Sequence, residues 1–390
     1  MILKLLIVII IIIILIFFCT LLFGSVLFIK NVQRRREIRR IKDIANLNPI
    51  LKRIFSEETV KFSVNAEHKM DLLKEKLRDK YSYQTLEELL LGYLESETGE
   101  TKLRAQAIAY HFGFPEKCLF MIRDRLTANI AIGCHKAGLY EYESAVPDMF
   151  KALDIVSGDI QLQALMAFAR IGGTVAMIQA LNKIHRFILV NERAFSEILN
   201  TFSGDRYVLF RSMIRHESEY LVHLFLKSID EETAATLVNE IIAVYKSSSN
   251  REIRLAGIIA IGRSGNSRKI RILIDAMKDE EWQIRAMAAK TLGVLTNPRA
   301  IPLLKKAARD REWWVRQNAI ASILAYPNCE EVLVSIVRKR DLFAYESILY
   351  TLGKANETKL LSTIREVWQE GTKVPEVEVK KQADLMEQVC

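Results

Sequence analysis

Cysteine and histidine are the residues of this chain best suited to hold a metal ion, and their spacing does not favour a metal site. Cys134 and His135 are adjacent, and Cys118 lies upstream of them. Metal sites commonly draw their ligands from Cys-x-x-Cys or His-x-x-x-His pairs, and the 390-residue sequence contains neither. The five cysteines are odd in number and widely spaced, which is typical of reduced cytoplasmic thiols rather than of a disulfide framework. We therefore predict that these side chains pack between helices and that no metal is bound.

Signatures of catalysis are incomplete in a similar way. His216-Glu217 begins like a zinc-protease helix, but Tyr220 stands where the second histidine is needed and His223 comes too late. The segment Gly262–Gly265 contains a serine before a glycine, as a nucleophile elbow does. Its predicted context is helix–turn–helix, however, whereas a nucleophile elbow lies between a strand and a helix. The sequence also lacks a glycine-rich loop with the lysine that cradles phosphate. These observations predict no catalytic residues and no cofactor, so we expect that the chain is not an enzyme.

Charged side chains recur with a fixed period of 31 residues in the C-terminal part of the chain. Three arginines follow this period, namely Arg254, Arg285 and Arg316. Three aspartates follow it as well, namely Asp279, Asp310 and Asp341. One hypothesis is that the arginines form a ladder presented to an acidic ligand. The other is that each arginine bonds to an aspartate of its own or the adjacent turn and ties neighbouring repeats together.

Tryptophan follows the same register and suggests a surface for recognition. Trp282 and Trp313 share one phase of the repeat, and Trp314 is adjacent to Trp313. Neighbouring residues on a helix point about 100° apart, so Trp313 and Trp314 cannot both face inward. Exposed tryptophan beside arginine is typical of interaction hot spots. We therefore predict a protein-binding site at Trp282, Trp313, Trp314 and Arg316.

Pairs of helices are the elements that must position these residues. Asn297 can cap a helix whose first position is Pro298, and Ile301, Leu304 and Ala308 then recur at helical spacing. Pro302 lies early in the same stretch and is expected to bend the helix. A second helix follows Asp310, which can cap it. The apolar face of this helix consists of Val315, Ala319, Ile323 and Leu324. A fixed period of this length is the mark of a solenoid, so we predict an all-α fold of stacked antiparallel helix pairs.

The segment DEEWQIRAMAAKTLGVLTNPRAIPLLKKAARDREWWVRQNAIASIL resembles HEAT repeats of the short type found in bilin-lyase-like proteins. In that family an aspartate at the turn is followed six residues later by arginine on the second helix, here Asp279 with Arg285 and Asp310 with Arg316. The resemblance implies that these pairs form a structural ladder between repeats. Ser347 replaces the arginine expected after Asp341, so the last copy is degenerate.

An uncharged run from Leu5 to Ile29, closed by Lys4 and Lys30, predicts one transmembrane helix before the solenoid. A cleaved signal peptide is disfavoured, because the run is long and no small-x-small cleavage site follows it. Seven Lys and Arg residues between positions 30 and 42, against Glu37 and Asp43, give a local charge of +5 out of a total of +9. The positive-inside rule then places the solenoid in the cytoplasm, at the cell membrane with a single pass.

We predict four segments along the chain. Residues 1–30 are the transmembrane anchor, 31–83 a basic, helical juxtamembrane linker, 84–370 the solenoid and 371–390 a C-terminal tail, with the most regular repeats in 250–355. The juxtamembrane stretch either lies on an anionic leaflet as an amphipathic helix or continues the anchor helix into solvent. In both cases Asn48-Pro49 is expected to end that helix.

These predictions lead to a membrane-anchored, non-catalytic HEAT-repeat scaffold. Its expected partner is a membrane-associated protein, for example an integral membrane enzyme such as a polysaccharide synthase. The alternative is a HEAT-like protein that handles a ligand, either bilin-lyase-like or nucleic-acid-binding. Nucleic acid is not expected, because most of the excess positive charge flanks the anchor and the arginine column stops at Ser347.

Overall fold

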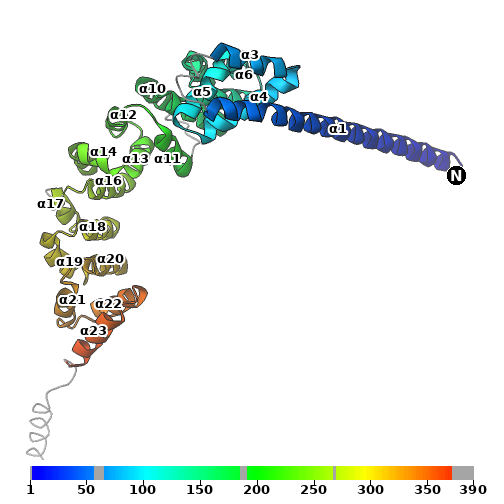
Figure 1. Ribbon diagram of the computed structural model, residues 1–390. Helices are drawn as coiled ribbons and strands as arrows, with labels where there is room; N and C mark the ends of the chain where they lie inside the picture. Colours follow the sequence, from blue (N-terminus) through cyan, green and yellow to red (C-terminus); the bar gives the residue numbers. More distant parts are fainter. Residues whose placement is uncertain (1, 57–65, 185–190, 267–268, 371–390) are drawn as a thin grey trace, which may run out of the picture. The chain divides into compact units, whose positions relative to one another are not determined.

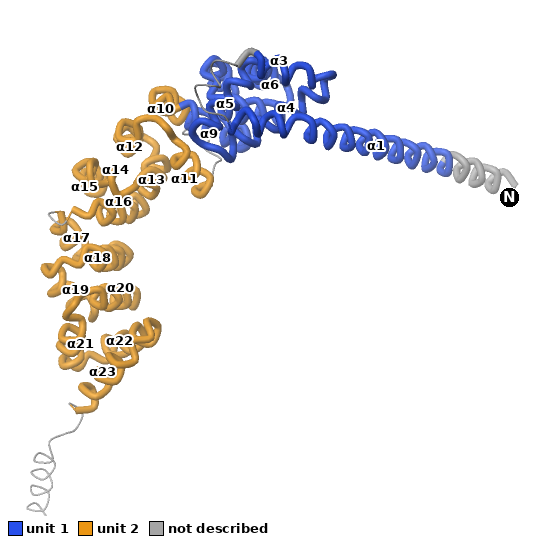
Figure 2. Tube along the Cα trace, viewed as in Figure 1, with its two compact units in different colours: residues 1–171 blue, residues 172–390 orange. Residues whose placement is uncertain are grey.

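The computed structural model describes residues 2–56, 66–184, 191–266 and 269–370, with the side chains of 2–14, 66 and 67 excepted. Every regular element of these residues is a helix (Figure 1). The chain divides into two compact units, an N-terminal unit of residues 1–171 and a C-terminal unit of residues 172–390 (Figure 2). This division differs from the predicted boundaries at residues 30, 83 and 370, which stay a prediction.

The N-terminal unit begins with one long helix, α1, followed by shorter helices packed on its C-terminal part. The helices are α1 (Ile2–Ser56), α3 (Ala66–Lys76), α4 (Lys80–Ser96), α5 (Gly99–His111), α6 (Phe114–Ile122), α7 (Thr127–Leu139), α8 (Val146–Ala152) and α9 (Gly158–Ile171), with a 3-10 turn, η1 (Glu143–Ala145), before α8. Residues 15–29 of α1 are exposed and apolar. By length and composition, α1 is the one candidate for a membrane span among the residues described, and a signal sequence passes the same test.

The predicted helix end at Asn48-Pro49 is wrong, because α1 continues through Pro49 to Ser56. Pro49 removes one backbone hydrogen bond, but Leu47, Leu51 and Ile54 on either side are almost completely buried. The packing of this face against α3, α4 and α5 outweighs the local preference, and it makes the second half of α1 part of the folded unit.

A buried arginine caps the C-terminal end of α1. Arg104 of α5 donates from Nη1 to the carbonyl oxygens of Ile54 and Phe55, at 3.0 and 3.1 Å, and from Nη2 to Glu100 at 2.7 Å. The last carbonyls of a helix have no partner within it, so a cation is favourable there.

The C-terminal unit is built from shorter helices that alternate between two layers. The helices are α10 (Thr174–Ile184), α11 (Glu192–Thr201), α12 (Arg206–Met213), α13 (Glu219–Ser228), α14 (Glu231–Thr236), α15 (Val238–Ser247), α16 (Arg251–Arg263), α17 (Ile270–Ala276), α18 (Trp282–Leu295), α19 (Ile301–Ala307), α20 (Trp313–Ile323), α21 (Cys329–Val337), α22 (Leu342–Lys354) and α23 (Thr358–Glu370), with a 3-10 turn, η3 (Pro298–Ala300), before α19. The helices α16, α18, α20 and α22 contact one another in sequence and form one layer. The helices α17, α19 and α21 stand beside them as the second layer (Figure 2).

The turn chemistry of the best repeat differs from its prediction in one detail. Asn297 accepts a hydrogen bond from the backbone N–H of Arg299 at 3.0 Å, as its capping role predicts. The capped element, however, is the 3-10 turn η3, and α19 begins only at Ile301, with Pro302 in its first turn. Pro302 therefore starts a helix instead of bending one, because the missing N–H of proline costs no bond in a first turn.

Small residues let the helices of the first layer approach closely. A Cβ atom on Gly293 of α18 would lie 2.4 Å from the hydroxyl oxygen of Ser322 on α20. One repeat earlier, a Cβ atom on Gly262 would lie 2.3 Å from Thr291. The period of 31 residues therefore extends to the contacts that set the spacing of the layer.

Candidate functional site

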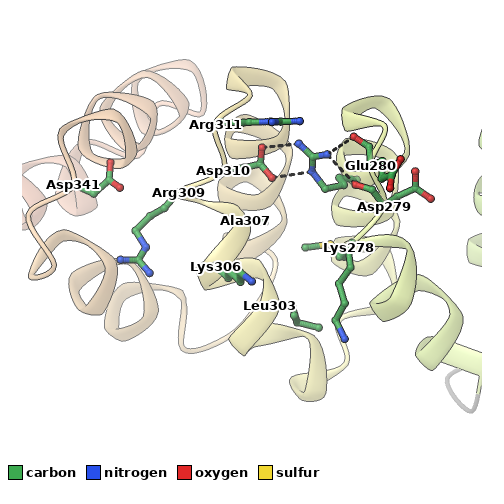
Figure 3. A pocket seen from close by; sticks show the side chains of 12 residues that line it. Lys278, Asp279, Glu280, Leu303, Lys306, Ala307, Arg309, Asp310, Arg311 and Asp341 are labelled. Carbon is green, nitrogen blue, oxygen red and sulfur yellow. Dashed lines mark hydrogen bonds and ion pairs between the residues drawn. The ribbon is translucent and has the colours of Figure 1, made fainter.

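Arg285 lies at the junction of two repeats, and its guanidinium group donates hydrogen bonds to both of them. Its Nε and Nη2 atoms each donate to the Asp310 carboxylate at 2.9 Å, in the bidentate geometry that suits arginine. Its Nη1 atom donates to the backbone carbonyls of Asp279 and Glu280, both at 2.9 Å. Figure 3 shows the Asp310 carboxylate with its two bonds and the loop of Asp279 and Glu280. The side chain is 10% exposed and therefore largely buried.

The other two arginines also bond to the following repeat, each with its own set of partners. Arg254 pairs with the carboxylates of Asp279 and Glu281, the second at 3.0 Å. Arg316 donates to the backbone carbonyls of Asp310 and Arg311 at 2.9 and 3.0 Å, and to the hydroxyl of Ser347 at 3.0 Å.

Asp341 does not take the corresponding place in the ladder. Its carboxylate accepts from the backbone N–H of Ala344 at 3.0 Å and caps α22. Ser347, at the position of the missing arginine, receives the bond from Arg316 instead. The guanidinium groups of Arg285 and Arg316 are thus occupied by the neighbouring repeat, and a functional role for Arg316 would have to be indirect.

The contacts of Asp310 also set its ionisation. Burial raises the pKa of this carboxyl group, but the hydrogen bonds from Arg285 and from the backbone N–H of Glu312, with the charges of Arg285 and Arg311, lower it by more. The net pKa lies below its ordinary value. The carboxylate is therefore stabilised in its charged form by the arginine that it holds.

An aromatic cluster lies on α20 and α22. The exposed fractions are 38% for Trp313 and 57% for Trp314, and their rings meet edge to face with centroids 4.6 Å apart. Trp313 also meets Tyr350 of α22 at 5.5 Å. Phe343 is 65% exposed and lies over the guanidinium group of Arg316, 5.6 Å from its ring centroid. We call Trp313, Trp314, Phe343 and Tyr350 the aromatic cluster.

Two members of the aromatic cluster, Phe343 and Tyr350, are not among the predicted site residues. They are seven residues apart, so two turns of α22 place them on one helix face, and this spacing could have revealed them. The predicted member Trp282 begins α18 and is half-buried. Arg316 lies beneath Phe343 and supports the cluster from the interior.

Cys118, Cys134 and His135 lie in packed or hydrogen-bonded positions. Burial raises the pKa of Cys118 and of Cys134 to about 12, which keeps both thiols protonated. The imidazole of His135 lies 3.0 Å from Gln163 through Nδ1 and 3.0 Å from Glu95 through Nε2. Among the described residues, no group of three His, Cys, Asp or Glu side chains is arranged to hold a metal ion.

A buried carboxylate in the N-terminal unit has no counterpart in the sequence analysis. Glu87 of α4 accepts from Nζ of Lys136 at 2.6 Å and from the hydroxyl of Tyr140 at 3.2 Å. Burial raises the pKa of Tyr140, whose side chain is fully enclosed. This ion pair joins α4 to α7.

Comparison with known proteins identifies HEAT repeats within the C-terminal unit. The family model of HEAT repeats matches residues 238–325, from α15 to the end of α20. The predicted HEAT-like all-α solenoid is confirmed by this match together with the two-layered helical fold.

A solved structure that the chain resembles is "The structure of the complex of CpcE and CpcF of phycocyanin lyase from Nostoc sp. PCC7120". It is 14% identical, and the match covers 66% of this chain and 94% of that chain with a TM-score of 0.26. No curated protein sequence matches.

This comparison contradicts the prediction that the chain is not an enzyme, because the matched structure belongs to a lyase. We withdraw that prediction. It rested on missing local motifs, and such motifs are absent from any catalytic site whose residues come from distant repeats. At this TM-score the match carries no argument for a particular reaction in this chain.

Proposed function

We propose that this chain is a membrane-tethered HEAT-like solenoid that binds a protein partner through the aromatic cluster. The observation that carries the proposal is the exposure of four aromatic side chains on the layer formed by α20 and α22. Trp313 contacts both Trp314 and Tyr350, and Phe343 lies two turns before Tyr350 on the same face of α22. Tryptophan and tyrosine dominate binding hot spots, since they bury a large area with few rotatable bonds.

The support beneath the aromatic cluster favours recognition by a rigid surface. Arg316 is fixed by the carbonyls of Asp310 and Arg311 and by Ser347, and it lies against the ring of Phe343. A surface held in its bound form loses little entropy on association. In a solenoid each repeat contacts only its neighbours, so such a surface stays free for a partner.

The membrane part of the proposal rests on α1. Its residues 15–29 are apolar and exposed, and the following stretch from Lys30 to Lys42 carries the excess of positive charge. We propose that α1 stays as a single-pass anchor and that the positive flank holds the solenoid in the cytoplasm. A partner that is itself membrane-associated, such as an integral membrane enzyme, would then meet the aromatic cluster at high local concentration.

The unbroken course of α1 adds a geometric element to this proposal. The helix runs from the end of the apolar stretch at Ile29 to the buried Leu47 without interruption. At about 1.5 Å per residue, it would hold the folded part of the N-terminal unit on the order of 25 Å from the hydrocarbon boundary. The continuous helix supports the alternative in which the anchor helix extends into solvent over the one in which a basic helix lies flat on the leaflet.

The test compares two aromatic substitutions with a matched control. The partner is captured by crosslinking in membranes and identified, and its affinity for the full chain in detergent is measured. Trp314→Ala and Phe343→Ala should each weaken binding by about 2 kcal/mol or more, on the scale of a hot spot. Phe120→Ala removes an exposed ring of the N-terminal unit and should leave the affinity unchanged. Equal affinities for all the variants would exclude the aromatic cluster as the binding site.

A further inference from the structure

A groove between α19 and α21, in the second helix layer, gathers positive charge. It encloses about 450 Å³ and is lined by basic side chains from α19 and from the turns that follow α19 and α21. The charged residues are Lys305, Lys306, Arg309 and Lys339. We call this the cationic groove.

None of the residues lining the cationic groove is acidic. Within the described parts of the chain, no side-chain hydrogen bond or ion pair engages its four cations. The contrast with Arg254, Arg285 and Arg316, which bond to carboxylates, carbonyls or a hydroxyl, is direct. The same repeats therefore satisfy one set of cations internally and leave another set free.

The cationic groove is also lined by apolar side chains. These are Ile301, Pro302 and Ile336, and Ser335 lies among them with its hydroxyl donating to the carbonyl of Val332 at 2.5 Å. A lining that is both cationic and apolar suits a segment that carries carboxylates and also has hydrocarbon to bury.

A second groove of about 860 Å³ adjoins the first and shares Lys306 and Arg309 with it. It is lined by carboxylates as well as cations, as Figure 3 shows for Asp279, Glu280, Asp310 and Asp341. A flat anionic membrane pressed on this side would meet these carboxylates. A narrow acidic segment lying in the cationic groove would meet a lining without carboxylates.

We infer that the cationic groove binds an acidic peptide segment of a protein partner. The carboxylates of the segment would pair with Lys305, Lys306, Arg309 and Lys339, and its apolar side chains would rest on Ile301 and Ile336. This site lies on a different helix layer from the aromatic cluster, and it does not depend on binding there.

The test uses the full chain in nanodiscs of neutral lipid and a fluorescent octaglutamate peptide as the probe, with binding followed by anisotropy. One variant changes all four groove cations, Lys305→Gln, Lys306→Gln, Arg309→Gln and Lys339→Gln. A matched control removes the same charge from exposed positions elsewhere, Lys290→Gln, Arg299→Gln, Lys354→Gln and Lys359→Gln. Circular dichroism verifies that both variants are folded.

We expect the groove variant to bind the peptide roughly tenfold more weakly or worse, and the control to bind it within about twofold of the unchanged chain. A groove variant in which all four positions are arginine should keep the affinity. Equal losses in the groove variant and the control would overturn the inference, because the peptide would then respond only to net charge. Undiminished binding by the groove variant would overturn it as well.

A second arm replaces the peptide with vesicles that contain phosphatidylserine. If the groove variant loses its binding to these vesicles and keeps its binding to the peptide, the groove is a membrane contact and the inference is wrong. The aromatic variants Trp314→Ala and Phe343→Ala serve here as further controls. They should bind the peptide normally, so a failure at this groove is distinct from a failure at the aromatic cluster.

Discussion

Arg285 is the residue on which the contact between two repeats depends most directly. Four of its bonds are made at 2.9 Å, two to the carboxylate of Asp310 and two to the carbonyls of Asp279 and Glu280. A planar guanidinium group can serve both repeats at once, which the single ammonium of lysine cannot do with the same geometry.

Arg285→Ala should therefore destabilise the contact between α18 and α20. The substitution leaves the Asp310 carboxylate without its bidentate partner and two loop carbonyls unpaired, at a cost of about 3 kcal/mol. Hydrogen exchange of the α18 and α20 amides measures this locally. Arg311→Ala is the control, since its side chain is 78% exposed and lies 3.9 Å from Glu312, and it should cost no more than about 0.5 kcal/mol. If Arg285→Ala left exchange unchanged and abolished partner binding, the arginine would be a ligand-binding residue.

Asp310 gives the same contact a dependence on pH. Its pKa is lower in the folded chain than its ordinary value. A carboxyl group of this kind contributes stability that is present above the unfolded pKa and is lost as the pH falls through the folded pKa. Protection of α18 and α20 should therefore decrease below about pH 4, where an unperturbed aspartate takes up its proton. Asp310→Asn should lack this part of the decrease, and a constant offset between the two pH profiles would contradict the explanation.

Residue types and spacing predict part of this site and miss the rest. The pairing of Arg285 with Asp310 follows from two residue sets that share a period of 31. The bond from Arg316 to Ser347 does not follow from the period. The period predicts Asp341 as the partner of Arg316, whereas the observed partner is Ser347 on α22. Phe343 and Tyr350 were missed because they have no counterparts in the earlier repeats, although their spacing on α22 was visible.

At the scale of elements, Gly293 allows α18 and α20 to pack closely against each other. The Cβ atom of an alanine here would lie 2.4 Å from the hydroxyl oxygen of Ser322 and 2.8 Å from its Cα atom. Since backbone lies behind that side chain, α18 and α20 would have to move apart.

Gly293→Ala should destabilise the stack by about 1–3 kcal/mol, although alanine is the better helix former. Gly353→Ala is a matched control on α22, at the position that corresponds to Ser322 in the next repeat, and nothing lies within 4 Å of its Cβ atom. That change should stabilise by up to about 1 kcal/mol. Thermal unfolding of the two variants compares them, and Ser322→Gly should partly rescue Gly293→Ala. A neutral Gly293→Ala would show that the layer can adjust at no cost.

The elements show where local sequence signals are sufficient. The repeat period fixes the alternation of helices from α16 to α22, because each unit must bury one face on its neighbour. The course of α1 through Pro49 is not predictable from local preference, because it depends on burial of Leu47, Leu51 and Ile54 by helices that come later in the chain. Tertiary packing decides such cases.

At the scale of the whole molecule, the proposal makes the position of the chain across a membrane testable. The mature chain should keep its N-terminal residues, which an intact mass measurement shows. Protease added outside spheroplasts should spare everything beyond residue 60, and the same residues should be digested once the membrane is opened with detergent. Digestion from outside would reverse the proposed orientation, and a shortened mass would indicate a cleaved signal sequence.

The proposed function depends on a protein partner that binds the aromatic cluster at the membrane. The most direct measurement is photocrosslinking in intact membranes from Phe343→p-benzoylphenylalanine, with Phe120→p-benzoylphenylalanine, an exposed position of the N-terminal unit, as the control. We predict a light-dependent adduct with one membrane-associated protein from position 343, no such adduct from position 120, and loss of the adduct when Trp314→Ala is added. The absence of an adduct from position 343, or the same adducts from both positions, would contradict the account.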